Sequence, residues 1–258
     1  MTAPRSSAVL GVASMVGGFL LWEVAVRLLV RGDLIVVPPS AIWTAFVRLL
    51  RSGELATNLA VSGAEFAHGF ALSTVVGIPL GVLMASSRTL RALLDPWVAA
   101  LNSTPRIALA PLLIVWLGIG LASKVALVFL SAVFPILINT LTGVRVIDAE
   151  LVEAARAFGA RPRDVFLKVL IPAAVPFIVA GLRLGVSRGI IGVVVGELLG
   201  STAGIGYMLY TAGQTFDTAA LFVGVVVIAC FGMGSDLALK WLEGRLAPWR
   251  LSVERAAP

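Results

Sequence analysis

Residues 125–144 read VALVFLSAVFPILINTLTGV, and residues 145–168 continue the chain as RVIDAELVEAARAFGARPRDVFLK. The first stretch is uncharged and matches the roughly 20 apolar residues that a helix needs to span a bilayer. The second stretch, called the charged segment below, holds nine of the chain's 34 charges (20 Lys and Arg, 14 Asp and Glu). Because charged side chains are costly within lipid, this segment must lie in water beside the membrane. The function of the protein depends on what it contacts there.

The composition of the whole chain is that of a membrane protein. Hydrophobic residues make up 59 % of the 258 residues and charged residues 13 %, against about 45–50 % and about 25 % in soluble proteins. Backbone polar groups in lipid must be hydrogen-bonded within each spanning segment, which favours helices. We therefore expect an all-α polytopic membrane protein. Uncharged stretches occupy residues 8–22, 66–87, 107–123, 125–144 and 218–235.

The order of these stretches predicts six transmembrane helices in a single transmembrane domain that covers residues 1–258. The predicted spans are residues 8–30, 57–86, 92–116, 121–143, 172–197 and 217–240. We interpret the first as a retained span rather than a signal peptide, because no small-residue cleavage site follows its apolar core. Between the first two spans, Ile42, Trp43 and Phe46 recur at helical spacing. This spacing predicts a short amphipathic helix near residues 40–52 at the outer membrane interface.

The distribution of basic residues predicts the orientation of the chain. If the N-terminus is cytoplasmic, the inner segments hold 15 of the 20 Lys and Arg residues. The five on the outer side are Arg27, Arg31, Arg48, Arg51 and Lys124. Cytoplasmic segments are generally enriched in Lys and Arg, so we expect both termini and the charged segment in the cytoplasm. The same bias accounts for the net charge of +6, and we expect no nucleic-acid partner.

Residue counts exclude several kinds of active site. The chain has one histidine and one cysteine, Cys230, which lies in an apolar run. These counts exclude a disulfide framework, a cysteine or histidine metal centre and a nucleophile–histidine–acid site. The chain also lacks the GxxxxGK[ST] loop that cradles nucleotide phosphates. We therefore expect a protein that is not an enzyme and that binds no cofactor directly.

The charged segment is predicted to form two short helices joined by a hinge. Asp148 suits the N-cap of the first helix, and Ala154 and Ala155 are strong helix formers. Gly159 falls where a left-handed C-cap is expected. Pro162 then suits the first turn of the second helix.

The second of these helices is predicted to end near residue 171, because Pro172 follows. The first helix presents an apolar face made of Leu151, Ala155 and Phe158. An apolar face on a polar helix requires a partner surface. We therefore interpret the charged segment as a docking element rather than a solvated loop.

The spacing within this segment resembles the signature of a known family. EAAxxxG at residues 153–159, followed after nine residues by VxIP at 169–172, resembles the EAA signature of permease subunits of bacterial ATP-binding-cassette importers. The signature usually has isoleucine and leucine where this chain has Val169 and Ile171, and both changes are conservative. The flanking segments resemble the nitrate/sulfonate/taurine-type branch, over about residues 58–249. These segments are residues 103–120, 134–144, 172–199 and 204–208.

The resemblance implies a type I importer permease in the inner membrane of a bacterium. Such a subunit pairs with a second copy, usually itself, and each copy docks a coupling segment, here residues 145–171, onto one of two cytoplasmic ATPases that use ATP and Mg²⁺. A periplasmic or lipid-anchored binding protein delivers the solute. By resemblance, Glu153 anchors the coupling helix against the ATPase and Gly159 sets the turn. The residues assigned to coupling are Glu153, Ala154, Ala155, Phe158, Gly159, Arg161 and Pro172.

Ionisable residues within the spans are candidates for the translocation pathway. Glu65 and His68 are three residues apart on one face of the second span, where they can pair or lie near the outer interface. Members of this branch often have arginine at the position of Glu65, so an anion-binding role is not transferred to it. The pathway candidates are Glu65, His68, Arg106, Arg188 and Glu197.

Three of these candidates also have a structural interpretation. Arg188, with Arg183, can anchor its helix in the inner leaflet or pair with acids of the charged segment. Glu197 is either a gate residue or the solvated outer end of the fifth span. Arg106, beside Pro105, is open to the same choice between a pathway and a structural role.

The fifth span carries a stripe of glycines within an arc of roughly 100° at helical spacing. The stripe consists of Gly181, Gly185, Gly189, Gly192 and Gly196. Small residues let neighbouring helices approach closely, and we prefer this packing role to a direct role in lining the pathway. Prolines within the second and third spans break the helical hydrogen bonding and indicate kinked helices along a pathway.

We conclude from the sequence that the chain is the transmembrane subunit of an ATP-binding-cassette importer for a small anionic solute, such as nitrate, a sulfonate, taurine or an organic acid. Two alternatives stay open. A gradient-driven secondary transporter would use Glu65 and His68 but would have no use for the charged segment. A membrane scaffold for ATPases would use the charged segment but would form no pathway.

Overall fold

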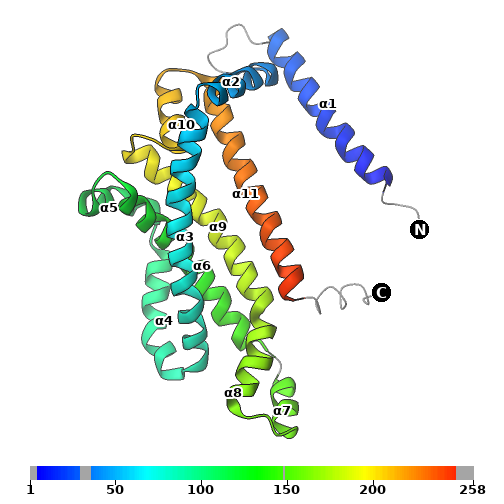
Figure 1. Ribbon diagram of the computed structural model, residues 1–258, viewed down its shortest axis with the longest axis vertical. Coiled ribbons are helices and arrows are strands. Elements are labelled where there is room, and N and C mark those ends of the chain that lie inside the picture. The colour runs from blue at the N-terminus through cyan, green and yellow to red at the C-terminus, as the bar shows by residue number, and fades with distance from the viewer. Residues whose placement is uncertain (1–4, 30–35, 148, 248–258) are drawn as a thin grey trace.

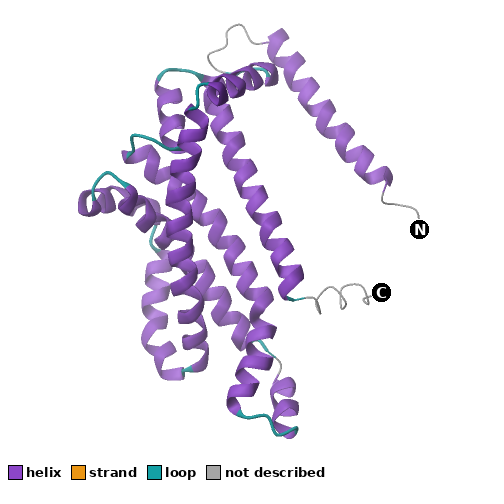
Figure 2. Cartoon of the chain, viewed as in Figure 1, coloured by secondary structure: helices purple, strands orange, loops and turns teal. Residues whose placement is uncertain are grey.

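The computed structural model describes residues 5–29, 36–147 and 149–247 as a bundle of helices (Figure 1), and no strand occurs among these residues (Figure 2). The all-α prediction is confirmed. The predicted N-cap Asp148 lies outside the described residues. The elements are α1 (Arg5–Leu29), α2 (Pro39–Arg51), α3 (Glu54–Ser86), α4 (Arg88–Ser103), the 3-10 turn η1 (Arg106–Leu109), α5 (Ala110–Leu117), α6 (Leu121–Arg145), α7 (Ala149–Ala157), α8 (Pro162–Val165), the π-helical turn η2 (Phe166–Leu170), α9 (Ile171–Gly200), α10 (Ile205–Gln214) and α11 (Thr218–Leu246).

Five helical stretches are long and apolar enough to cross a membrane. They are Val9–Leu28, Glu54–Ser86, Leu121–Arg145, Pro162–Gly200 and Thr218–Leu246. Each contains or overlaps one of the predicted spans. The helix α2 also forms close to the residues where a short amphipathic helix is predicted.

The third predicted span, residues 92–116, is not one straight helix, and the kink that its prolines predict is confirmed. Helix α4 and the stretch Arg106–Leu117 meet at an angle of 85°, and only together do they qualify as a sixth candidate span. The break occurs because Pro105 disfavours helical backbone at Thr104, which is extended (φ −69°, ψ 129°). The span is therefore a broken helix, with Arg106 placed directly after the break.

Helix α6 packs between α3 and α9 and forms the centre of the bundle. Val128 and Ile136 of α6 are completely buried. The glycine stripe of α9 faces α6: a Cβ added to Gly181 would lie 2.9 Å from Asn139 Cβ, and one added to Gly192 would lie 2.9 Å from Ser131 Oγ. Such separations are too short for ordinary Cβ contacts, so the stripe is where α9 and α6 approach most closely.

A second glycine row, on α3, also approaches α6 closely. A Cβ on Gly69 would lie 2.5 Å from Val128 Cβ, and one on Gly81 would lie 2.7 Å from the Leu137 carbonyl oxygen. Gly77 lies between them, and a Cβ added to it would lie 3.0 Å from Ile136 Cγ2. The central helix is therefore held by small residues on both neighbours, as is usual for helices that associate in membranes.

The second helix of the charged segment does not end before Pro172, and that prediction is wrong. Helix α8, the turn η2 and α9 follow one another without a break from residue 162 to residue 200. The wide turn η2 precedes the proline, and the Ile171 N–H donates to the Phe166 carbonyl five residues back. A π-turn shifts the hydrogen-bond register, so Pro172, which has no N–H and clashes with a regular preceding turn, is accommodated inside a continuous helix.

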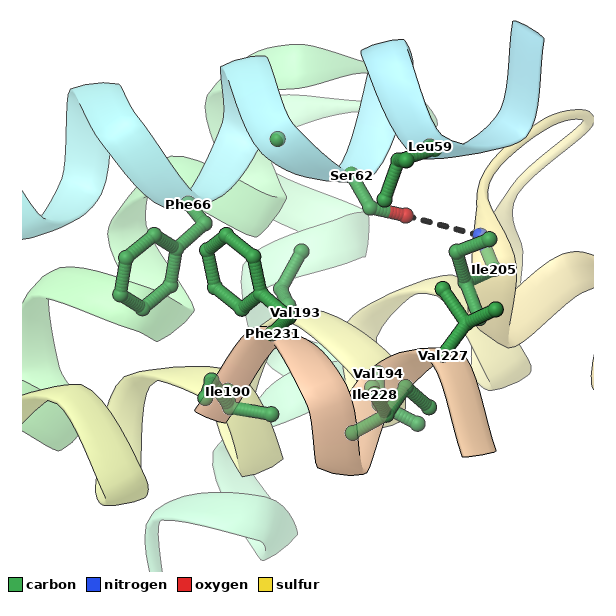
Figure 3. A pocket seen from close by; sticks show the side chains of 11 residues that line it. Leu59, Ser62, Phe66, Ile190, Val193, Val194, Ile205, Val227, Ile228 and Phe231 are labelled. Atoms are coloured by element: carbon green, nitrogen blue, oxygen red, sulfur yellow. Dashed lines mark hydrogen bonds between the residues drawn. The ribbon is translucent and has the colours of Figure 1, made fainter. Parts of the chain in front are cut away.

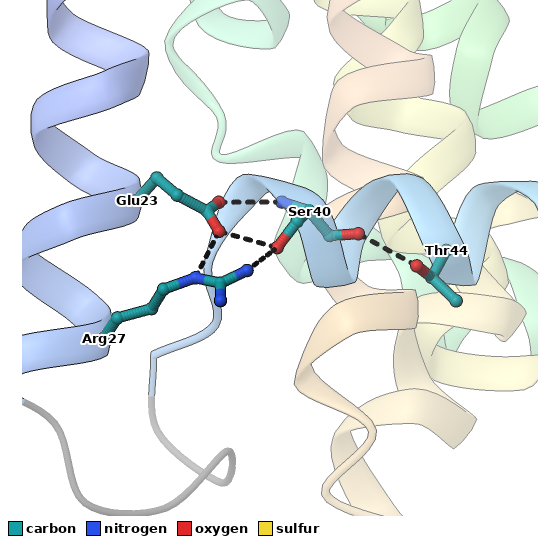
Figure 4. Close-up of polar contacts among 4 residues, drawn as sticks. All are labelled: Glu23, Arg27, Ser40 and Thr44. Atoms are coloured by element: carbon teal, nitrogen blue, oxygen red, sulfur yellow. Dashed lines mark hydrogen bonds and ion pairs between the residues drawn. The ribbon is translucent and has the colours of Figure 1, made fainter.

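A polar cluster joins α1 to the start of α2 (Figure 4). The Glu23 carboxylate accepts hydrogen bonds from the Ser40 N–H at 3.0 Å and from the Ser40 hydroxyl at 2.8 Å. Arg27 Nε donates to the same carboxylate at 2.6 Å. Since α2 has no side-chain cap of its own, Glu23 supplies the missing acceptor and fixes the corner between the two helices.

Candidate functional site

The charged segment forms an exposed hairpin of α7 and α8 at one end of the molecule, and α2 and α10 lie at the other end (Figure 1). Helix α7 ends in a Schellman motif: the Ala160 N–H donates to the Ala155 carbonyl, and the Gly159 N–H donates to the Arg156 carbonyl. Gly159 has φ +82°, and Pro162 begins α8. The predicted glycine C-cap and proline start are confirmed.

The apolar face of α7 is uncovered. The Phe158 side chain is 93 % exposed, Leu151 is exposed, and Ala155 is half-buried. Glu153 is also exposed, and within the part of the chain that the structure describes it makes no hydrogen bond or ion pair. A phenylalanine left in water gains most by binding a partner, so the α7 face has the properties of a docking surface.

The other residues assigned to coupling surround this face. Ala154 and Arg161 are exposed, and Pro172 is half-buried at the start of α9. Helix α8 continues through η2 into α9, which runs through the bundle.

At the other end of the molecule, Glu65 of α3, Lys124 of α6 and Glu197 of α9 come together in the interior. Their exposed fractions are 4 %, 1 % and 1 %. The Lys124 Nζ donates to the Gly200 carbonyl, and the carboxyl groups of Glu65 and Glu197 lie next to each other and interact. The solvated helix end that was one interpretation of Glu197 is therefore wrong, since its carboxylate lies inside the protein.

Glu197 holds the start of α10. Its two oxygens accept hydrogen bonds of 2.6 Å, one from the Gly206 N–H and one from the Ser62 hydroxyl. Gly204 has φ +113°, and a Cβ on it would lie 2.3 Å from the Glu197 carboxyl carbon. The glycines at residues 204 and 206 are thus needed because the backbone passes directly over a buried carboxylate.

Helix α3 supplies the remaining partners of this turn. The Gly204 N–H donates to Asn58 Oδ1 and the Ile205 N–H to Ser62 Oγ, both at 2.8 Å. Sequence reasoning missed Asn58, Ser62 and Lys124. The available signal was the spacing of residues 58, 62 and 65, which places three polar side chains on one face of an apolar helix.

His68 does not contact Glu65, so the predicted pairing of these two residues is wrong. The His68 side chain is exposed, and its Nδ1 lies 2.6 Å from the Ala64 carbonyl oxygen of its own helix. Glu65 instead faces the interior. The two side chains diverge although they are three residues apart.

Arg106 and Arg188 form a pair of like charges beside the break in the third span. Arg106 Nη2 donates to the Asn102 carbonyl and to Asn102 Oδ1, each at 2.6 Å, and its guanidinium lies 5.3 Å from the Phe134 ring centroid. The charge of Arg188 on α9 acts on it. Among the described residues neither arginine has an acidic partner, and Arg106 Nε is buried without a hydrogen bond.

Arg183 has a different role from Arg188. It contacts Glu243 at 2.7 Å and Asp236 at 3.5 Å, both on α11. The pairing of Arg183 with acids of the charged segment is therefore not observed, and this arginine ties α9 to α11.

Two cavities among the described residues are apolar, whereas a third, of about 290 Å³, is lined partly by charged residues, among them Arg48, Glu54 and Asp217. One of about 30 Å³ lies between α3, α9 and α11, and its single polar lining group, the Ser62 hydroxyl, is already bonded to Ile205 (Figure 3). A wider groove of about 670 Å³ is lined by apolar side chains of α1, α2, α3 and α11, with Pro39 at the start of α2. Neither offers a charged solute a binding group. No cluster of potential metal ligands occurs in the described ranges.

Comparison with known proteins agrees with this architecture. A family described as "Binding-protein-dependent transport system inner membrane component" matches residues 77–248. The chain is 37 % identical to the putative aliphatic sulfonates transport permease protein SsuC of Bacillus subtilis (strain 168), over 91 % of this chain and 85 % of that protein. It is 32 % identical to the taurine transport system permease protein TauC of Escherichia coli (strain K12), over 90 % and 86 %.

A solved structure shares the fold. A chain of the inward-facing MetNI methionine ABC transporter superposes with a TM-score of 0.65, covering 81 % of this chain and 99 % of that one. The sequence identity is 21 %, so the likeness concerns the fold alone.

Proposed function

Because the chain belongs to the family of binding-protein-dependent transport inner-membrane components, and is the permease subunit of an ABC importer, we propose that two copies of it form the pathway for a small sulfonate-like anion. The subunit is not itself catalytic and works with an ATPase and a binding protein. In this proposal, ATP and Mg²⁺ are bound by the two ATPase subunits, and this chain needs no cofactor of its own. The alternative of a gradient-driven carrier is based on a pair formed by Glu65 and His68. The structure does not support it, since His68 does not contact Glu65.

The observation that carries the coupling part of the proposal is the uncovered face of α7, which a short turn joins to the continuous helix of residues 162–200. In our proposal, Phe158 and Leu151 enter a cleft of the ATPase, and Glu153 and Arg161 form the polar rim of that contact. Gly159 and the Schellman hydrogen bonds hold α7 at a fixed angle to α8. Closure of the ATPases then displaces α7, and the continuous helix of residues 162–200 transmits the movement to the interior.

The anionic solute is supported by the unpaired cations at the broken span. Two guanidinium groups without acidic partners repel each other, and an anion between or beside them relieves that repulsion. Contacts with Asn102 and Phe134 hold the Arg106 side chain in one orientation. Its guanidinium group therefore has a fixed position. Two relatives are named as permeases for aliphatic sulfonates and for taurine. These solutes contain an anionic sulfonate group, which the two arginines could bind.

The orientation in the membrane is proposed from the basic residues. The positive-inside distribution puts the termini and α7 in the cytoplasm of a bacterium, where the ATPases are. The buried cluster around Glu197 and the start of α10 then lies toward the outer face, where a binding protein delivers the solute. A single cysteine placed beside Arg161, in a variant without Cys230, should react with a membrane-impermeant reagent from the cytoplasmic side only.

The test is solute-stimulated ATP hydrolysis in proteoliposomes that contain the chain, its ATPase and its binding protein. Arg106→Gln and Arg188→Gln should abolish stimulation by sulfonates while the complex still assembles. Arg88→Gln makes the same change of charge at an exposed site on α4 and should behave as the wild type. Undiminished sulfonate stimulation in the Arg106→Gln, Arg188→Gln double variant would contradict the assignment of these residues to the pathway.

A further inference from the structure

The buried cluster of Glu65, Lys124 and Glu197 has an unbalanced charge. It contains two carboxyl groups and one ammonium group, each on a side chain at most 4 % exposed. If all three were ionised, the interior would carry a net negative charge. A buried charge without a partner is strongly unfavourable, so the arrangement requires one further positive charge or one proton.

The hydrogen bonds identify which carboxyl group holds that proton. Glu197 accepts from two donors, the Ser62 hydroxyl and the Gly206 N–H, and donors directed at both oxygens favour the carboxylate form. Glu65 Oε2 accepts from nothing among the described residues. Two carboxyl groups in direct contact need a proton between them, because two carboxylates have no hydrogen to donate.

From this geometry we propose that Glu65 is a proton-binding site: it carries a proton that it donates to the Glu197 carboxylate, and the protonated pair with Lys124 fastens the start of α10 to α3 and α6. The charged groups that face the pair are Lys124 from α6 and the two carboxyl groups themselves from α3 and α9, while α10 contributes the Gly206 N–H. Loss of the proton leaves two carboxylates in contact inside the protein. Their repulsion separates α3 from α9 and frees the turn at Gly204. The site is independent of the anion pathway, which involves other residues.

The same change, from glutamate to glutamine, is expected to have different effects at the two positions. Glu65→Gln keeps a hydrogen-bond donor toward Glu197 and removes the titratable proton. Glu197→Gln instead places an amide, which can accept through one atom only, before two donors. The experiment measures the melting temperature of the full-length chain, in complex with its ATPase in lipid nanodiscs, from mildly acidic to mildly alkaline pH. Glu54→Gln is the control, because it removes an exposed carboxyl group from the same helix.

We expect the melting temperature of the wild type to fall as the pH rises, because the folded state loses a proton that holds it together. At acidic pH, the melting temperature of Glu65→Gln should equal that of the wild type. As the pH rises, the variant should not show the decrease that is caused by loss of the Glu65 proton. Glu197→Gln should be less stable at every pH, and Glu54→Gln should follow the wild type. A Glu65→Gln variant as unstable at acidic pH as Glu197→Gln would overturn the proposal, since Glu65 would then act as a carboxylate.

Infrared spectroscopy gives a readout that stability alone does not. A protonated carboxyl group has a C=O stretching band that a carboxylate lacks. The wild type should show this band for a buried group, and Glu65→Gln should remove it while Glu54→Gln retains it. Persistence of the full band in Glu65→Gln would also overturn the proposal. Neither measurement depends on the solute, so failure here is separable from failure of the proposed function.

Discussion

The two charged regions of this molecule are built in opposite ways. The charged segment of α7 and α8 concentrates its charges within 24 consecutive residues and exposes them, whereas the interior cluster assembles Glu65, Lys124 and Glu197 from three different helices and buries them. Exposed charges are hydrated, so each is individually dispensable for folding. Buried charges stabilise only as a complete set, because each is the partner of another. The same type of residue is therefore exposed at one end of the bundle, where we propose docking, and buried in the interior cluster at the other.

The largest expected effect is a difference between two lysines. Lys124→Met removes the cation of the interior cluster, and leaving buried carboxyl groups without their countercharge costs about 3–5 kcal/mol of unfolding free energy. Lys168→Met removes an exposed lysine that pairs with Asp164 at 2.8 Å and should leave stability unchanged. Thermal unfolding of the two purified variants checks the comparison, and equal stability of both would show that the buried cluster is not a structural unit.

The next effect concerns binding rather than stability. Phe158→Ala removes the most exposed apolar side chain of α7 and should weaken association with the ATPase by about 2 kcal/mol, roughly 30-fold, as expected for an aromatic anchor. The unfolding temperature of the isolated chain should not change. Titration of the ATPase against the variant measures this, with Leu50→Ala on α2 as an exposed apolar control. Unaltered affinity would remove Phe158 from the docking surface.

A smaller effect is expected at the hinge. Gly159→Ala forces a residue with a Cβ into left-handed backbone, which costs roughly 1–2 kcal/mol, and should increase hydrogen exchange at the end of α7. Gly17→Ala, within α1 and with open space around it, should be neutral or slightly stabilising because its backbone is helical. If both variants leave exchange in α7 unchanged, the hinge does not depend on the conformation of Gly159.

The smallest effect is a surface contact between α2 and α11. Burial alone would raise the pKa of Asp217, but hydrogen bonds from the Ala220 N–H and from Arg48 outweigh it and lower the pKa below its ordinary 3.8. The folded state therefore holds this proton less tightly than the unfolded chain, so the contribution to stability is present above about pH 4 and is lost as the pH falls through the folded-state pKa.

Asp217→Asn should accordingly lower stability at neutral pH by about 0.2–1 kcal/mol, as for other exposed ion pairs. It should make no difference at strongly acidic pH. Unfolding midpoints of the variant and the wild type at both pH values measure this, and a pH-independent difference would show that the charge of Asp217 does not cause the effect.

The charged segment was predictable because its signals are local. The caps at Gly159 and Pro162 depend on backbone geometry within a few residues, and so does the apolar face that ends at Phe158. The local prediction that failed concerns Pro172. Pro105 and Pro172 were both interpreted from the residue alone, yet one breaks its helix by 85° and the other lies within a continuous helix. The difference is the π-turn before Pro172, which depends on hydrogen bonding along the chain.

The sequence by itself determined the membrane class, most of the spans and the docking segment, because composition, capping and helical periodicity act over short distances along the chain. Only the tertiary structure decided that Glu65 meets Glu197 and Lys124 while its near neighbour His68 is exposed. It also decided that α6 is held between two rows of glycines. These features depend on how helices distant in sequence rotate and approach one another, and that rotation is set by the packing of the whole bundle. A dense group of surface charges can therefore be recognised from the sequence. A buried cluster assembled from distant helices can be recognised only from the tertiary structure.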